Sequence, residues 1–168
     1  GEYGGYLPIL HALRADLDLV HMQFYNSGTQ LVYEGPNPSP KGLVVTKGTP
    51  DFAVALAEML ILGFPVAQNK NQYFPGLGAH KVALGLPATP SAASGGGYLS
   101  PASLQAALRY LKTGQPTYRS AYRLRQQGGH PNLGGLMTWS INWDASRDGG
   151  KPPYSFARES TRIWRELP

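Results

Sequence analysis

Apolar residues recur at helical spacing in four separate stretches of the chain, which predicts four helices. The predicted helices cover residues 5–17, 49–63, 100–114 and 155–167. Local signals support two of them, because Thr49 and Ser100 each precede a proline and can cap a helix that begins there. Gly63 and Gly114 follow the last apolar positions of these two helices and are suitable stops.

Short apolar stretches alternate with the helices and predict three strands. They cover residues 18–26, 80–86 and 134–143. Helices and strands that alternate along a chain are typical of an α/β fold with parallel strands. Long loops follow the strands, at residues 27–48, 87–99 and 144–154, and in β/α barrels such loops build the active site. Because three strands cannot close a barrel of eight, the chain is either a small open sheet or a part of a larger barrel.

Composition narrows the class of protein. The chain has 168 residues, of which 42% are hydrophobic, so it is long and apolar enough to form a core. It has no cysteine, which excludes disulfides and thiolate metal sites, and its four histidines have no ligand spacing. No apolar run approaches the roughly 18 residues of a membrane span, and no signal peptide opens the chain. We therefore expect no metal site and no membrane partner.

The net charge of +5 is unevenly distributed along the chain. No acidic residue lies between Glu58 and Asp144, and the basic residues in this gap include Arg119, Arg123 and Arg125. A basic patch for nucleic acid is one interpretation of this gap. A solvated loop and helix face is the favoured interpretation, because the basic residues do not gather on one periodic element. We therefore expect no nucleic-acid partner.

Polar side chains end the first predicted strand. Strand side chains alternate, so Gln23 and Tyr25 share one face and Phe24 takes the other, while Asn26 follows directly. A phenol and two amides suit a ligand that carries hydroxyl or amide groups. A hydrogen-bonded cap at the end of a strand is the alternative interpretation of the same residues.

Two tryptophans lie near the end of the third predicted strand. Trp139 and Trp143 are four residues apart, and residues with that spacing share one face of a strand. Indole rings form flat apolar surfaces on which the C–H faces of sugar rings stack. The alternative is that both rings are ordinary members of the core.

Five motifs together resemble the bacterial chitinases of glycoside hydrolase family 18. MQFYN at 22–26, VALGLPA at 82–88 and GLMTWSINWD at 135–144 are similar to barrel strands six, seven and eight of that family. GGGYLSP at 95–101 resembles the loop after strand seven, and YGGYLPIL at 3–10 resembles the helix between strands five and six. The resemblance implies that residues 1–168 form a single partial domain, the carboxy-terminal half of a TIM (β/α)8 barrel.

The resemblance also implies a function and roles for single residues. The family hydrolyses β-1,4 N-acetylglucosamine linkages in chitin and chito-oligosaccharides, and the acetamide of the substrate acts as the nucleophile. By the resemblance, Tyr25 is the catalytic phenol that hydrogen-bonds the acetamide oxygen, and Trp139 is the floor under the sugar. Gln23 and Asn26 are neighbouring substrate contacts. No cofactor is implied, and the complete enzyme is expected to be secreted.

One family motif has no counterpart in the chain. The general acid of the family ends an Asp-x-x-Asp-x-Asp-x-Glu run after strand four, and no such run occurs among these 168 residues. We therefore expect a separate amino-terminal half of the barrel as a partner, and we expect this chain to be inactive on its own. A chitinase-like protein that binds chitin or other carbohydrate without catalysis is the alternative function.

Overall fold

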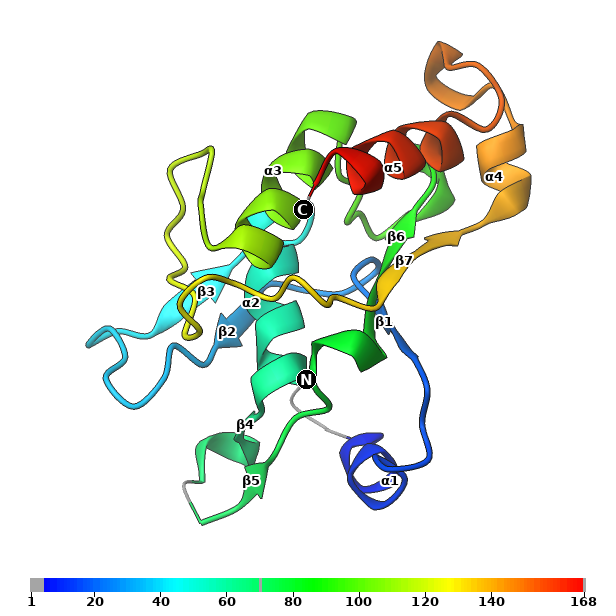
Figure 1. Cartoon of the computed structure of the whole chain (residues 1–168). Helices are drawn as coiled ribbons and strands as arrows, with labels where there is room; N and C mark the ends of the chain where they lie inside the picture. The colour runs from blue at the N-terminus through cyan, green and yellow to red at the C-terminus, as the bar shows by residue number, and fades with distance from the viewer. Residues whose placement is uncertain (1–4, 70, 168) are drawn as a thin grey trace.

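A computed structural model describes residues 5–69 and 71–167, and its centre is a sheet of three parallel strands (Figure 1). The strands are β1 (Val20–Gln23), β6 (Val82–Pro87) and β7 (Gly135–Trp139), in the order β1-β6-β7. Both pairs are parallel, with Gln23 opposite Gly85 and Gly85 opposite Met137. The prediction of parallel strands that neighbour one another in chain order is confirmed.

Helices connect and cover these strands. They are α1 (Leu7–Ala12), α2 (Pro50–Leu62), α3 (Pro101–Thr113), α4 (Ile141–Ala145) and α5 (Ser155–Glu166), with short 3-10 turns at Val66–Gln68, Ala79–Lys81, Pro90–Ala92 and Asp148–Gly150. The predicted caps are present, because the hydroxyl of Thr49 accepts the amide of Phe52 at 3.3 Å and that of Ser100 accepts the amide of Ser103 at 3.2 Å.

The first helix is shorter than the predicted range of 5–17. It ends at Ala12 and buries none of its residues, and Leu13 beyond it is 46% exposed. Helices depend on tertiary packing for most of their stability, so leucine spacing alone did not extend this one.

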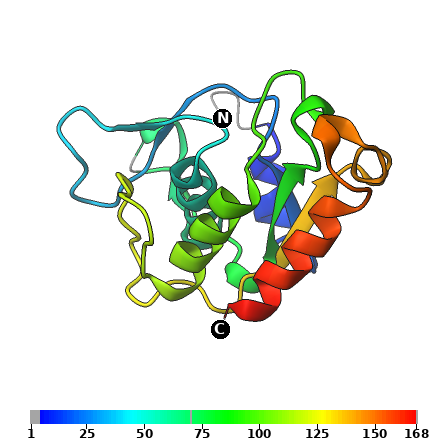
Figure 2. The same ribbon diagram turned by 90° about the horizontal axis from the view of Figure 1, so that it is seen from above.

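The core lies between the sheet and three of the helices. Alternate strand residues such as Phe24, Leu84 and Leu136 face a cluster that includes Phe52 of α2 and Ile163 of α5. Figure 2 shows α3 and α5 side by side in front of the strands. The other face of the sheet therefore carries the remaining strand residues, whose side chains are not part of this core.

Four very short strands were not predicted. Gln30–Val32 (β2) pairs antiparallel with Leu43–Val45 (β3), inside the range expected to be a loop. Phe64–Pro65 (β4) pairs in the same way with Tyr73–Phe74 (β5). Two- and three-residue strands are too short to show the alternation by which a strand is predicted.

The third strand was predicted too long, since β7 ends at Trp139 rather than at residue 143. The peptide bond from Trp139 to Ser140 is cis, and α4 begins at Ile141. Asp144 in α4 then fixes the start of α5, because its buried carboxylate accepts the amides of Phe156 at 2.7 Å and of Ala157 at 3.0 Å. The prediction that Trp139 and Trp143 share a strand face is therefore wrong.

A buried carboxylate holds the long segment between α3 and β7. Glu58 of α2 is 0% exposed and accepts hydrogen bonds from the ring of His130 (2.9 Å), the hydroxyl of Tyr122 (2.9 Å) and the amides of Arg125 (2.8 Å) and Gln126 (3.2 Å). Burial alone would raise the pKa of Glu58, but these hydrogen bonds outweigh it and hold that pKa below its ordinary value. Glu58 is therefore an ionised structural anchor on the helix side of the sheet.

The side chain of Arg125 also turns inward. Its guanidinium donates to the carbonyl oxygens of Gly63 and Glu58, both at 2.9 Å, at the end of α2. Arg119 and Arg123 are exposed in the same segment, which has no helix or strand. In the part of the chain that the structure describes, no helix is long and apolar enough to cross a membrane.

Candidate active site

The strand register places the two aromatic residues predicted for the site on one face. Residues in register across parallel strands point to the same side of the sheet. Gln23, Gly85 and Met137 form one such row, and Pro87 pairs with Trp139 two residues further along. The amide of Phe24 still bonds to the carbonyl of Gly85 at 2.9 Å, so the ladder leads directly to Tyr25. Alternation along the chain therefore puts Tyr25 on the same face as Gln23, just beyond the end of β1, and Trp139 on that face at the end of β7.

The side chain of Met137 confirms which face this is. A Cβ atom added to Gly85 would lie 2.8 Å from the terminal carbon of Met137, so the methionine lies over this glycine. Tyr25 is buried but is absent from the core cluster that faces the helices. The site face is thus the one opposite to α2, α3 and α5.

The two aromatic residues differ in their exposure to solvent. Tyr25 is 6% exposed, whereas Trp139 is 53% exposed and offers a large apolar surface. Burial raises the pKa of the Tyr25 phenol above its ordinary value of 10.0. Near neutral pH the phenol is therefore protonated and can donate a hydrogen bond, next to a ring on which a sugar can stack.

Gln23 and Asn26 use part of their hydrogen-bonding capacity on the protein itself. The Gln23 side chain donates to the carbonyl of Tyr25 at 2.8 Å. Asn26 has a left-handed backbone with φ of 53°, and its side-chain oxygen accepts the amide of Gly95 at 2.7 Å. Among the described residues, the side-chain oxygen of Gln23 and the side-chain nitrogen of Asn26 take no part in these two hydrogen bonds.

A glycine-rich loop after β6 packs against the end of β1. The amide of Asn26 bonds to the carbonyl of Gly96 at 3.0 Å. Gly97 has φ of +113°, and a Cβ atom on it would lie 2.6 Å from both the carbonyl oxygen of Phe24 and the Cα of Tyr25. Only glycine permits this approach, so the loop holds the backbone of Tyr25 in place. Three consecutive glycines were the sequence signal for this contact, but the signal did not identify the partner.

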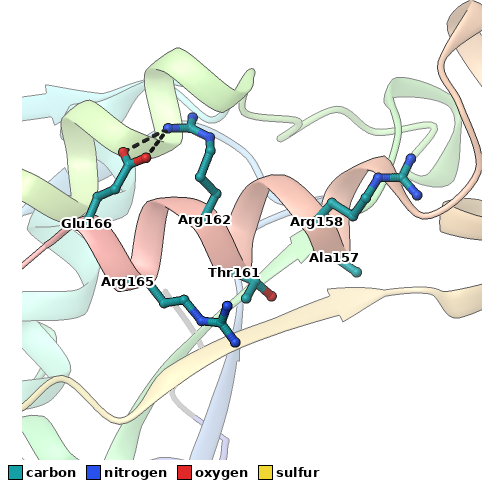
Figure 3. A pocket seen from close by; sticks show the side chains of 6 residues that line it. All are labelled: Ala157, Arg158, Thr161, Arg162, Arg165 and Glu166. Carbon is teal, nitrogen blue, oxygen red and sulfur yellow. Dashed lines mark hydrogen bonds and ion pairs between the residues drawn. The ribbon is translucent and has the colours of Figure 1, made fainter.

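Two hollows of the structure are bordered by α5. The larger, about 550 Å³, follows the outer face of α5, where Arg162 bridges Glu166 at 2.8 Å (Figure 3). It has no aromatic lining and faces away from Tyr25. The smaller, about 310 Å³, lies between α3 and α5.

The described residues contain no group of three or more His, Asp or Glu side chains that could hold a metal ion. His130, which is 2% exposed, bonds to Glu58. What the strand ends offer is a protonated phenol, two amides and an indole. This set can hold and orient a neutral polar ligand through hydrogen bonds and stacking.

Three parallel strands connected by helices are the arrangement expected of one part of a β/α barrel, with the candidate site at the carboxyl ends of the strands. No family model matches the chain. It is 47% identical to "Chitinase D" of Niallia circulans over 145 residues, which are 86% of this chain and 26% of that protein. It is 46% identical to "Chitinase Chi52" of Paenibacillus xylanexedens over the same share of each.

A solved structure agrees with these relatives. The family GH18 chitinase from Chromobacterium violaceum matches with a TM-score of 0.80 and 34% identity, covering 98% of this chain and 40% of that one. The chain belongs to glycoside hydrolase family 18 and forms part of its TIM barrel. It spans about a quarter of the length of the two curated relatives.

Proposed function

We propose that this chain supplies one wall of the active site of a chitinase that hydrolyses β-1,4 N-acetylglucosamine linkages. The observation that supports the proposal is the strand register, in which Gln23, Gly85 and Met137 form one row and Trp139 ends β7 on the same face, so that Tyr25, two residues after Gln23, is expected on that face as well. In β/α barrels the active site is built at this end of the strands. The relatives named as chitinases supply the substrate class.

The reaction that fits is substrate-assisted and retains the anomeric configuration. The acetamide oxygen of the sugar attacks C1, the glycosidic bond breaks, and the leaving oxygen takes a proton from a general acid. Water then opens the cyclic oxazolinium ion. In this scheme the Tyr25 hydroxyl donates a hydrogen bond to the acetamide oxygen and orients it towards C1. Such positioning lowers the barrier because the nucleophile is already in place.

Trp139 would bind the sugar at the point of cleavage. Its exposed ring can stack on the C–H face of the pyranose and hold the ring over the Tyr25 hydroxyl. The free oxygen of the Gln23 side chain and the free nitrogen of Asn26 can accept from and donate to neighbouring sugar groups. These three contacts act on the bound substrate as well as on the transition state.

The general acid would come from a part of the barrel outside these residues. Glu58 is fully buried on the helix side of the sheet. Asp144 caps α5, while Glu159 and Glu166 pair with Arg162 on that helix. We therefore propose that the chain alone does not hydrolyse chitin and that an amino-terminal half of the barrel completes it. The complete enzyme would act outside the cell, where its insoluble polymer is found.

A second candidate is carbohydrate binding without hydrolysis, because stacking on the half-exposed Trp139 needs no acid. A fluorogenic chitobioside assay separates the candidates. It would compare the chain alone with a chimera in which the chain replaces the matching part of the Chromobacterium violaceum enzyme. We expect turnover only in the chimera and expect Tyr25→Phe to reduce it. Equal turnover by the chain alone would refute the proposed source of the acid, and a chimera that binds without turnover would favour the second candidate.

A further inference from the structure

The position of the Trp139 ring depends strongly on the backbone that carries it. Trp139 is 53% exposed, so the packing around its ring is incomplete. On the strand side the backbone is fixed, because β7 pairs with β6 as far as Pro87 and the amide of Ala88 donates to the carbonyl oxygen of Trp139 at 2.9 Å. On the other side the chain enters α4, a helix of only five residues. A helix this short is not stable by itself, so other contacts must hold it.

Asp148 connects the end of this segment to the loop after β6. Its carboxylate accepts two hydrogen bonds from Ser91, one from the hydroxyl at 2.9 Å and one from the backbone amide at 3.2 Å. Ser91 lies in the turn Pro90–Ala92 and Asp148 begins the turn Asp148–Gly150, and the two turns are in contact. Hydrogen bonds to a charged carboxylate are stronger than those between neutral groups. The partners are 57 residues apart in the sequence, so this pair joins the loops that follow two neighbouring strands.

Two connections to the same loop therefore enclose residues 140–147. The bond from Ala88 to Trp139 fixes the start of this segment, and the bonds from Ser91 to Asp148 fix its end. Ala88 and Ser91 are three residues apart, so both ends of the segment are held at nearly the same place. If the bonds to Asp148 were lost, the segment would be held to this loop at one end only, next to the residue that carries the indole.

We propose that Asp148 is a positioning residue for Trp139, which keeps the indole ring where a sugar can stack on it. The carboxylate is engaged by Ser91, so it acts through the loop and not on a ligand. The consequence for sugar binding rests on the proposed function, whereas the connection between the two loops does not. Loss of the carboxylate should weaken stacking on the ring and leave the hydroxyl of Tyr25, which lies on another strand, in place.

The first test follows the indole N–H signals of the 168-residue chain by NMR. The chain has 3 tryptophans, so each signal can be assigned by substitution. Asp148→Ala should shift or broaden the signal of Trp139 and leave that of Trp164 in α5 unchanged. Ser91→Ala removes only the hydroxyl of the pair and should cause a smaller change in the same signal. Asp18→Ala is the matched control, because this exposed carboxylate lies just before β1, at the opposite end of the strands.

The second test measures the inhibition of the chimera by a chito-oligosaccharide. Asp148→Ala should weaken the affinity roughly three- to tenfold, the effect of losing the hydrogen bonds of one side chain, and Asp18→Ala should leave it unchanged. In a chimera that already carries Trp139→Ala, the substitution of Asp148 should have no further effect, because the ring through which it acts is absent. A general loss of folding would instead weaken the affinity equally in both backgrounds.

Two outcomes would overturn the inference. The first is an unchanged signal of Trp139 in the Asp148→Ala chain. The second is an equal loss of affinity with and without the Trp139 ring. A chimera without turnover would refute the proposed function alone, because the indole signal reports the position of the ring without any substrate.

Discussion

Replacing Glu58 with glutamine should destabilise the chain, although the two side chains are nearly the same size. The carboxylate serves four donors and has no exposed surface. Glutamine retains one acceptor oxygen and places an NH2 group where the other was, so two of the four donors lose their acceptor. An unsatisfied buried donor costs about 1–3 kcal/mol. We therefore expect Glu58→Gln to lower the free energy of unfolding by about 2–6 kcal/mol at pH 7, a large share of a typical 5–15 kcal/mol.

The pH dependence of this effect has a definite sign. The pKa of Glu58 is held below its ordinary value of 4.5 in the folded chain. Its contribution to stability is therefore fully present above pH 4.5 and is lost as the pH falls through the lower, folded-state pKa. The difference in stability between the parent and Glu58→Gln should shrink on acidification below that pH. The comparison is made at pH 7 and in the acid range.

Urea unfolding followed by circular dichroism measures both effects. Glu166→Gln is the matched control, because Glu166 is an exposed carboxylate whose bond to Arg162 is expected to contribute less than about 1 kcal/mol. A Glu58→Gln variant as stable as this control at pH 7 would refute the role of Glu58 as an anchor. A stability difference that grows on acidification would refute the sign of the pKa shift.

Four further substitutions test the site and its supports. In the chimera, Tyr25→Phe should lower the turnover number more than it raises the Michaelis constant. The activation barrier should rise by about 1–3 kcal/mol. An effect on the Michaelis constant alone would make Tyr25 a simple binding contact. Trp139→Ala should weaken both binding and turnover there, which inhibition by a chito-oligosaccharide would measure. Asp144→Ala should lower the free energy of unfolding in urea by about 2 kcal/mol, because two amides at the start of α5 lose their acceptor. A smaller loss of stability than that of Glu166→Gln would contradict this. Gly97→Ala should lower the free energy of unfolding by about 1–3 kcal/mol, because the added carbon meets backbone atoms at 2.6 Å and the positive φ of this residue disfavours alanine. Limited proteolysis of residues 90–98 should become faster. An unchanged rate would contradict the tight approach.

Features that depend on a few neighbouring residues were predictable from the sequence. The hydroxyls of Thr49 and Ser100 cap their helices, because capping involves residues only three positions apart. The shared face of Gln23 and Tyr25 follows from strand alternation alone. The motifs around Tyr25 and Trp139 indicated the family, which the comparisons confirm.

Features that depend on distant partners were not predictable in this way. Glu58 has the sequence position of an ordinary helix residue, and its partners lie 64 to 72 residues further along the chain. Asp144 bonds to amides 12 and 13 residues further along the chain, and no pattern within residues 134–143 could show these contacts. Asn26 was predicted as a substrate contact, and its bond to Gly95, 69 residues away, appears only in the structure. Its proposed contact with substrate stays a prediction.

The anchoring of the segment after α3 by Glu58 divides the connections of this protein into two kinds. Residues 36–41, at the tip of the β2–β3 hairpin, are all exposed to solvent or nearly so, and no core residue comes from them. Residues 118–130 contain Tyr122 and His130, which are buried against α2. Insertions and deletions should therefore accumulate at the hairpin tip during evolution, while the segment after α3 keeps a constant length. A fusion partner or an affinity tag placed inside the protein belongs at the first position and not at the second.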